Sequence, residues 1–412
     1  GIKLKEMRTV MSNRKKVAIL NPYVATRGGG EKHMGYLCQF MEEYYNYDVD
    51  IDILVYSNEV FDVNSPDFVT IEDLNEQFSL NLKNTKIRKL DLLQYVRNHK
   101  EYLENKKALE KVTKEYDLFI NFMFLSKHIG KAKKNVYEVM FPPLRYRWEL
   151  NKTIFHKLFG AFLDELYYRS YDVYISNSKF TNRWQSEYWG ESSKNHVVYP
   201  PVFSENEIAG RYDESKKKNI IISVGRFFVS AHSKKQLEMV QFFVNNQDVF
   251  KDYEYHLCGV VSDDKADQEY LQKVREEAAK VDNVFIHLAC SHDELMELYG
   301  QAKIFWHGTG YGVDEDKEPE KMEHFGITTV EAMSFGAVPV VINKGGQKET
   351  VSEGVNGFRW DTEEECVNNT KKLIEDDNLR KKFAEKSVEL ANNYSIEKFY
   401  DANRRIFDEY KL

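Results

Sequence analysis

The sequence predicts an α/β protein built from two doubly wound, largely parallel sheets. Its 412 residues exceed the roughly 250–300 at which a single hydrophobic core stops growing. Apolar runs of strand length alternate with helical stretches in both halves, which is typical of parallel sheets covered by helices. Pro200-Pro201 and the polar residues 203–218 separate the halves. We therefore expect an N-terminal domain over 1–202, a second domain over 203–395, and a final helix over 396–412 that packs back on the first domain.

The N-terminal half opens with a buried strand over 16–21 and a glycine turn. Gly28, Gly29 and Gly30 lead into a helix over 31–43, and this arrangement brings backbone amides close to a phosphate or sugar. A tight flexible turn is the alternative. The turn matches neither G-x-G-x-x-G nor a Walker loop, so a dinucleotide or ATP site is not supported. Further strands are predicted at 49–55, 118–124, 136–141, 173–177 and 196–199.

Two stretches of this half could face an acceptor. Residues 81–115 are polar and amphipathic, and in 146–168 aromatic and leucine side chains recur at helical spacing. Such a stripe is more often the core-facing side of a helix. Residues 81–200 carry 22 Lys and Arg against 13 Asp and Glu, although the whole chain has a net charge of −8. That excess fits an anionic acceptor, a membrane surface or simply a solvated lysine-rich face.

The C-terminal half repeats the alternation and adds cations at one strand end. Arg226 follows a predicted strand over 219–224 directly, and Lys234 and Lys235 stand at the start of the next helix. Arginine offers a fork of donors and lysine a compact charge, and both suit a diphosphate. Strands follow at 253–258, 283–287 and 303–307, with helices at 266–280, 292–300 and from 379 onward.

Residues 323–346 carry a second set of polar groups. Glu323 stands where a turn enters a helix, and Glu331 lies eight residues on, about two helical turns deeper. The two carboxylates can therefore reach different parts of one elongated ligand. Backbone amides that could contact a diphosphate belong to His324, Phe325, Gly326, Ile327 and Thr328. An isolated pair of this spacing is more often two surface glutamates, but the cations of the same half make up the set that a nucleotide-diphosphate sugar needs.

Motifs along almost the whole chain resemble those of retaining glycosyltransferases of family 4, which have the GT-B fold. They are RGGGEKH at 27–33, ISNSKFT at 175–181, VVYPPV at 197–202, SVGRF at 223–227, EHFGITTVEAMSFG at 323–336, GGQKETV at 345–351 and GVNGF at 354–358. The NPY and EHFGI segments are similar to mannosyltransferases that extend lipid-linked oligosaccharides and to bacterial surface-polysaccharide enzymes. Of these two subgroups, the sequence favours the bacterial one.

The resemblance implies two Rossmann-like domains that face each other across a cleft, and a role for each motif. Glu331 would hold the ribose, and Glu323 would lie beside the transferred sugar. Arg226 with Lys234 or Lys235 would neutralise the diphosphate, and the amides after Glu323 would contact sugar or phosphate. The turn at 28–30 would close over the donor. The expected reaction moves a hexose from a nucleotide-diphosphate sugar to a glycan or lipid-linked acceptor, with no metal or other cofactor; a sugar-nucleotide epimerase and a non-catalytic binding subunit are the alternatives.

Two departures from the family pattern stand out. Where many relatives place a histidine at the end of an N-terminal strand, this chain has Met140 or Phe141, and His33 and His128 are candidate substitutes. In addition, residues 309–322 form an insertion whose glycines and charges suggest a mobile lid or a solvated loop.

Other classes of site are not supported. The four cysteines form no C-x-x-C pair, so neither a disulfide framework nor a zinc site is expected. The D-x-D matches at 48–50 and 314–316 do not end strands, and the basic residues form no nucleic-acid motif. No secretion signal opens the chain, and no apolar run approaches the ~20 residues of a membrane span. We therefore expect a cytoplasmic protein, or one bound peripherally at the inner face of the membrane.

Overall fold

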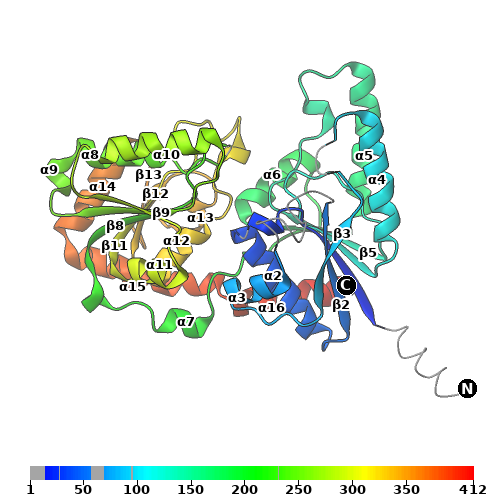
Figure 1. Cartoon of the computed structure of the whole chain (residues 1–412), viewed down its shortest axis with the longest axis horizontal. Helices are drawn as coiled ribbons and strands as arrows, with labels where there is room; N and C mark the ends of the chain where they lie inside the picture. Colours follow the sequence, from blue (N-terminus) through cyan, green and yellow to red (C-terminus); the bar gives the residue numbers. More distant parts are fainter. Residues whose placement is uncertain (1–13, 27, 57–68, 94–95, 231) are drawn as a thin grey trace, which may run out of the picture. The chain divides into compact units, whose positions relative to one another are not determined.

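The chain forms two compact α/β units in a computed structural model that describes residues 14–26, 28–56, 69–93, 96–230 and 232–412 (Figure 1). Unit 1 comprises Gly1–Pro201 and Phe399–Leu412, and unit 2 comprises Val202–Lys398. The boundaries expected from the sequence lay after residues 202 and 395.

Unit 1 is built on a seven-stranded sheet in the order β3-β2-β1-β4-β5-β6-β7, and all of its ladders are parallel. The strand order reverses between β1 and β4, so the turn after β1 lies at the point where parallel α/β sheets bind ligands. The strands are β1 (Lys15–Leu20), β2 (Val49–Tyr56), β3 (Thr85–Leu90), β4 (Leu118–Asn121), β5 (Lys134–Val139), β6 (Val173–Ser176) and β7 (Asn195–Val197). The helices are α2 (Gly29–Tyr44), α3 (Ile71–Phe78), α4 (His99–Thr113), α5 (Ile154–Ser170), α6 (Lys179–Trp189) and most of α16 (Ile396–Tyr410), with short 3-10 turns η1 (Val24–Thr26) and η3 (Tyr146–Trp148).

Strand β3 lies inside the stretch 81–115 that the sequence presents as polar and amphipathic. It pairs with β2 in parallel, with Thr85 opposite Ile51 and Leu90 opposite Tyr56. β3 is an edge strand, and edge strands tolerate charged side chains on both faces. Because residues 86–89 are largely charged, this strand lacks a clear apolar alternation, and the sequence pattern does not predict it.

Unit 2 repeats this architecture with a six-stranded parallel sheet in the order β10-β9-β8-β11-β12-β13. Its strand order reverses between β8 and β11. The strands are β8 (Lys218–Val224), β9 (Glu254–Gly259), β10 (Val284–Leu288), β11 (Ala302–His307), β12 (Val338–Ile342) and β13 (Phe358–Trp360). The helices are α7 (Glu205–Ala209), α8 (Gln236–Asn245), α9 (Gln247–Phe250), α10 (Lys265–Ala278), α11 (His292–Gln301), α12 (Ile327–Ser334), α13 (Gln347–Thr350), α14 (Glu363–Glu375) and α15 (Asp377–Ala391), with 3-10 turns η4 (Glu214–Lys216), η5 (Pro319–Lys321) and η6 (Asn392–Tyr394).

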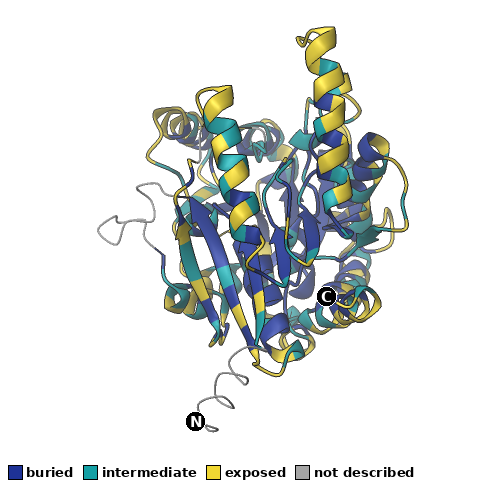
Figure 2. Cartoon of the chain, turned by 90° about the vertical axis from the view of Figure 1, so that its right-hand side faces the viewer, coloured by how far each residue is buried: buried dark blue, intermediate teal, exposed yellow. Residues whose placement is uncertain are grey.

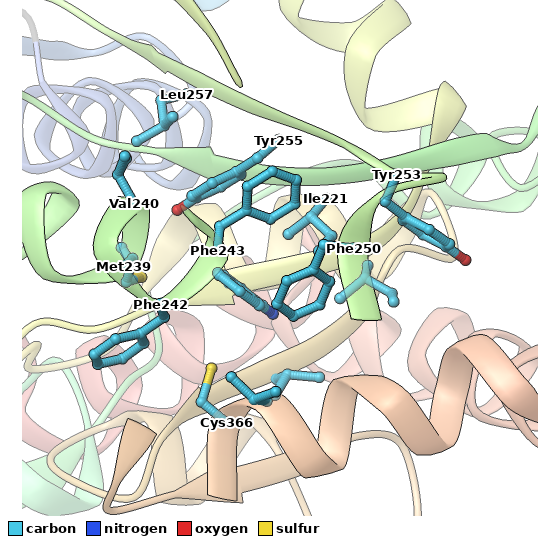
Figure 3. Close-up of a cluster of buried hydrophobic side chains, with 14 of the residues drawn as sticks. Ile221, Met239, Val240, Phe242, Phe243, Phe250, Tyr253, Tyr255, Leu257 and Cys366 are labelled. Atoms are coloured by element: carbon cyan, nitrogen blue, oxygen red, sulfur yellow. The ribbon is translucent and has the colours of Figure 1, made fainter. Parts of the chain in front are cut away.

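An aromatic core fixes the elements of unit 2 that carry the polar residues described below (Figure 3). Phe243 of α8 stacks on Phe250 at a centroid distance of 5.0 Å and lies 5.5 Å from Tyr255 of β9. Trp306 of β11 is fully buried and packs edge-on against Tyr255. Because buried aromatic side chains contribute large apolar areas, this packing holds α8, β9 and β11 in a fixed relation.

The chain ends on unit 1, where it began. In α16, Phe407 packs edge-on against Phe40 of α2 at 5.1 Å, and the Tyr410 hydroxyl lies 2.7 Å from Nε2 of His196. The last helix therefore covers α2 and the end of β7.

Candidate active site

A lysine–glutamate ion pair lies at the carboxyl ends of β8 and β11. Lys234 precedes α8 and Glu323 precedes α12, and Nζ of Lys234 donates to Oε2 of Glu323 over 2.5 Å. Each side chain is 21% exposed, so the pair is largely withdrawn from water yet accessible. The structure thus joins two of the predicted site residues, which are 89 positions apart in the chain, and places both where the strand order reverses.

His307 is a third member of this cluster. It is the last residue of β11, its side chain is 3% exposed, and its Nε2 lies 3.3 Å from Oε2 of Glu323. The sequence analysis did not single out His307. The available signal was its position, because a polar side chain that ends an otherwise apolar strand lies where parallel sheets bind their ligands.

The charge of Lys234 keeps Glu323 ionised. Burial alone would raise the pKa of the Glu323 carboxyl, but Lys234 and His307 together hold that pKa well below its ordinary value. For His307, burial lowers the pKa despite the neighbouring carboxylate. At neutral pH the cluster therefore holds one carboxylate, one ammonium group and an uncharged imidazole.

Two further histidines stand beside the pair. His232 and His324 meet edge to face with ring centroids 5.0 Å apart, and Nε2 of His324 lies 3.1 Å from the carbonyl oxygen of Glu320. Burial lowers the pKa of His324 to about 3 and lowers the pKa of His232 as well. Both rings are consequently neutral at physiological pH, which leaves Lys234 as the cation that balances Glu323.

The double glycine at 345–346 supports the backbone that presents Glu323. The amide of Gly346 donates to the carbonyl oxygen of Glu323 over 2.7 Å. A Cβ at Gly346 would lie 2.2 Å from the carbonyl oxygen of His324, and a Cβ at Gly345 would lie 2.3 Å from that of Glu323. Only glycine allows this close packing, because the obstructing atoms are backbone and cannot move aside as a flexible side chain would.

We expect Gly346→Ala to destabilise unit 2, because its methyl group would push the 323–325 backbone away from β12. The free energy of unfolding should fall by about 2 kcal/mol, in the range of overpacking substitutions, as measured by urea denaturation. Gly210→Ala is the matched control, since its Cβ meets no atom within 4 Å. Equal stability of the two variants would contradict the proposed support.

The amino terminus of α12 lies directly after Glu323. Gly326 is its N-cap with a φ of +95° and no side-chain cap, and an added Cβ there would lie 2.7 Å from Nε2 of Gln347. Phe325 is buried against Tyr394, while Ile327 and Thr328 are half-buried. The first amides of this helix are therefore uncapped by the N-cap residue and can bind an anion.

Glu331 projects from the second turn of α12 and is half-buried. Burial is the main cause of the raised pKa of the Tyr299 hydroxyl and of the lowered pKa of Arg211, while the charge of Glu331 adds to the first shift and opposes the second. Arg211 lies over the ring of Phe203 at 3.8 Å. Glu331 is thus held in a setting separate from the Lys234–Glu323 pair, as two carboxylates with different tasks would be.

Arg226 and Lys235 occupy different settings from Lys234. Arg226 is exposed directly after β8, with its guanidinium 5.4 Å from the ring centroid of Phe228. Lys235 is the N-cap of α8 with a φ of +57°, whereas the preceding residue, Lys234, is the one that pairs with Glu323. Gln236 ties this turn together, since its Nε2 donates to the carbonyl oxygen of Arg226 over 2.9 Å. The geometry therefore selects Lys234 over Lys235 as the partner of Glu323.

In unit 1 the glycine turn has its own anchor. Gly28, Gly29 and Gly30 are exposed at the start of α2, and Oε2 of Glu31 accepts hydrogen bonds from the Gly28 amide (2.7 Å) and the Thr26 hydroxyl (2.8 Å). A Cβ at Gly30 would meet nothing within 4 Å. The turn thus presents open backbone after β1, and its contact with a donor stays a prediction.

The insertion at 309–322 is anchored to the residues that follow β12, and its motion as a lid stays a prediction. Nζ of Lys344 donates to the carbonyl oxygens of Gly310 (3.0 Å) and Val313 (2.6 Å). Glu315 pairs with Lys348 at 3.2 Å and accepts a hydrogen bond from the Gly345 amide. Glu315 therefore braces the double glycine, whereas Asp314, Asp316 and Lys317 are exposed, as in the expected solvated loop.

The candidate histidines of unit 1 are structural. His33 is buried between Phe122 and Phe399, with centroids 5.1 and 5.4 Å away, and burial lowers its pKa to about 3. Nε2 of His128 lies 3.0 Å from the Tyr56 hydroxyl. Phe141 is buried as well. His33 is therefore enclosed by aromatic side chains, and one ring nitrogen of His128 is engaged by Tyr56.

Across the residues that the structure describes, no group of three or more His, Cys, Asp and Glu side chains is arranged to hold a metal ion.

Comparisons with known proteins identify similar families and folds. Residues 204–389 match the family model described as glycosyl transferases group 1. A GDP-Man:Man(3)GlcNAc(2)-PP-Dol alpha-1,2-mannosyltransferase of Dictyostelium discoideum is 27% identical over 168 residues, which cover 38% of this chain and 30% of the relative. The enzyme of the same description from Neurospora crassa is 27% identical over 229 residues, or 50% of this chain and 39% of the relative. The matches thus span less than half of either relative.

Solved structures extend the likeness to both units. A glycosyltransferase from Rickettsia africae has a TM-score of 0.68 at 16% identity and covers 97% of this chain and 99% of its own. The Anabaena protein HepE, solved in complex with UDP and glucose, has a TM-score of 0.66 at 15% identity over 96% of this chain and all of its own. Identities this low establish the fold alone. The GT-B fold predicted from the motifs is therefore confirmed, and residues 204–389 match the family model of glycosyl transferases group 1.

Proposed function

We propose that this chain is a retaining, metal-independent glycosyltransferase that moves a hexose from a nucleotide-diphosphate sugar to a lipid-linked or other glycan acceptor. The observation that carries the proposal is the buried Lys234–Glu323 pair beside the uncapped amino terminus of α12. Mannose is the first candidate for the sugar and GDP for the nucleotide, because the curated relatives have that description. Those relatives also favour lipid-linked oligosaccharide synthesis over the bacterial surface-polysaccharide role that the sequence motifs favoured.

The proposed chemistry is stabilisation of a leaving group. As the bond between the anomeric carbon and the diphosphate breaks, negative charge develops on the diphosphate. Arg226 at the end of β8, Lys234 and the first amides of α12 would meet that charge. The acceptor hydroxyl would attack from the same face, with its proton passing to the departing phosphate.

Each carboxylate has a distinct proposed task. Glu331 would hold the ribose hydroxyls. Glu323 would orient Lys234 and contact the transferred sugar, and its depressed pKa keeps it ionised for both. A carboxylate that accepts from a sugar hydroxyl loses that bond when protonated, so the low pKa suits the task.

The test is a thermal-shift screen of the full chain against GDP, UDP, ADP and dTDP and their sugars. A ligand that binds only the folded protein raises its melting temperature, and we expect GDP and GDP-mannose to give the largest shifts. Glu331→Ala should reduce the shift for every nucleotide, because the ribose is common to all of them. Glu364→Ala, an exposed glutamate of α14, is the control.

Failure of all eight ligands to shift the wild type would overturn the proposal. Release of nucleotide from the bound sugar without any acceptor would instead favour the epimerase alternative. Binding without turnover in the presence of membrane extracts that contain lipid-linked glycans would favour a non-catalytic subunit.

A further inference from the structure

Helix α5 exposes an apolar stripe that no other element covers among the described residues of unit 1. The exposed fractions are 79% for Ile154, 74% for Phe155, 69% for Leu158, 59% for Phe162 and 42% for Leu166, and those of Leu150 and Phe159 are 95% and 47%. In Figure 2 the helix that rises highest is α5, and much of its surface has the colour of exposed residues. These positions recur at helical spacing and therefore form one face.

The opposite face attaches α5 to unit 1 through small and polar groups. Gly160 packs against the ring of Tyr146, where a Cβ would come within 2.3 Å. Asp164 pairs with Lys127 at 2.9 Å and accepts a hydrogen bond from the Tyr146 amide, and Tyr167 is buried. The helix thus buries a glycine, an aspartate and a tyrosine, and leaves its large apolar side chains in solvent. This reverses the usual arrangement, in which such a stripe faces the core.

Exposed apolar faces of this size mark surfaces that bind something. The charges of unit 1 indicate what that is. Lys152 and Arg169 flank the stripe and Lys157 lies within the helix, and residues 81–200 carry 22 cationic against 13 anionic side chains, whereas 201–412 carry 28 against 40. An anionic surface is therefore attracted to this part of the chain and repelled by the other.

We propose that the exposed face of α5 inserts into the surface of a membrane that contains anionic lipids. Phe, Leu and Ile would enter the boundary between head groups and acyl chains, while the flanking lysine and arginine side chains contact lipid phosphates. Among the described residues no helix is long and apolar enough to cross a bilayer, so contact through this face is peripheral. A second copy of the chain is the alternative occupant, and the test below separates it from a membrane.

The test is sedimentation of the full chain with vesicles that contain neither donor nor acceptor, so its result is independent of the proposed reaction. We expect binding to phosphatidylcholine vesicles that include phosphatidylglycerol, and much weaker binding to pure phosphatidylcholine. Phe155→Ser combined with Leu158→Ser should weaken binding by at least about tenfold, since two apolar side chains of this size contribute more than that when buried. Melting temperature should stay unchanged, because both side chains are exposed in the folded chain.

Val260→Ser with Val355→Ser is the matched control, since these apolar residues of unit 2 are 49% and 44% exposed; it should bind as the wild type does. Lys152→Glu with Lys157→Glu should weaken binding to the anionic vesicles only. Equal binding of the wild type and the Phe155/Leu158 variant would overturn the proposal. So would a concentration-dependent dimer that this variant abolishes while vesicle binding persists.

Discussion

Lys234→Ala is expected to lower kcat/KM for the donor by about 100-fold or more, the usual loss when one group that stabilises transition-state charge is removed. The substitution removes the cation nearest to Glu323 and leaves that carboxylate among the uncharged rings of His232 and His307. It should also destabilise unit 2 by about 1–3 kcal/mol, because a largely buried carboxylate loses its partner. The rate of nucleotide release with the donor found in the thermal-shift screen measures the first effect, and urea denaturation the second.

Lys235→Ala is the matched control, because the two lysines are neighbours in sequence and only Lys234 pairs with Glu323. The control should keep both its rate and its stability. Equal losses in the two variants would show that the effect reflects general positive charge at the start of α8 and not the pair.

Glu323→Gln is the second substitution that we expect to lower turnover strongly. The side chain keeps its size but loses its charge, so Lys234 is no longer held by an ion pair. Turnover should fall by about 100-fold, while the affinity for the nucleoside diphosphate should be kept or increase, since Lys234 becomes free to pair with phosphate. Isothermal titration with the diphosphate and initial rates with the sugar donor separate these two quantities.

The stability of Glu323→Gln should also depend on pH differently from that of the wild type. The pKa of Glu323 is depressed in the folded chain from its ordinary value of 4.5. Its stabilising contribution is therefore complete above that value and is lost as the pH falls toward the folded pKa. Glu323→Gln should lack this component of acid destabilisation, and Glu364→Gln on the exposed surface of α14 should retain it. For the turnover prediction above, a loss of diphosphate affinity in Glu323→Gln as large as the loss in turnover would contradict the proposed role of Glu323 in orienting Lys234.

Much of the fold could be predicted from sequence, because buried parallel strands are short apolar runs. The strand beginning at Lys15 and that beginning at Lys218 were expected within one or two residues. The strands that were missed, β3 and β13, are both at sheet edges. β3 carries alternate charges and β13 has three residues, so neither gives an apolar run long enough to recognise.

The sequence predicted which residues belong to the candidate site, but not which lysine forms an ion pair with Glu323. Glu323, Lys234 and Arg226 stand out by motif and by position after strands. That Glu323 would pair with Lys234 and not with Lys235 depends on the left-handed backbone of Lys235 and on the packing of α8. Contacts between segments that are distant in the chain cannot be predicted from the local spacing of residues. For the same reason the sequence left open whether the stripe of α5 faces an acceptor or the core, since periodicity cannot distinguish a buried face from an exposed one.

The shared strand order of the two sheets places two turns at equivalent points. β1 to β6 and β8 to β13 follow the same order in their sheets, so the turn after β1 corresponds to the turn after β8. In unit 1 this point carries glycines and the carboxylate of Glu31, and in unit 2 it carries Arg226 and Lys234. The same architectural position thus offers bare backbone in one unit and positive charge in the other.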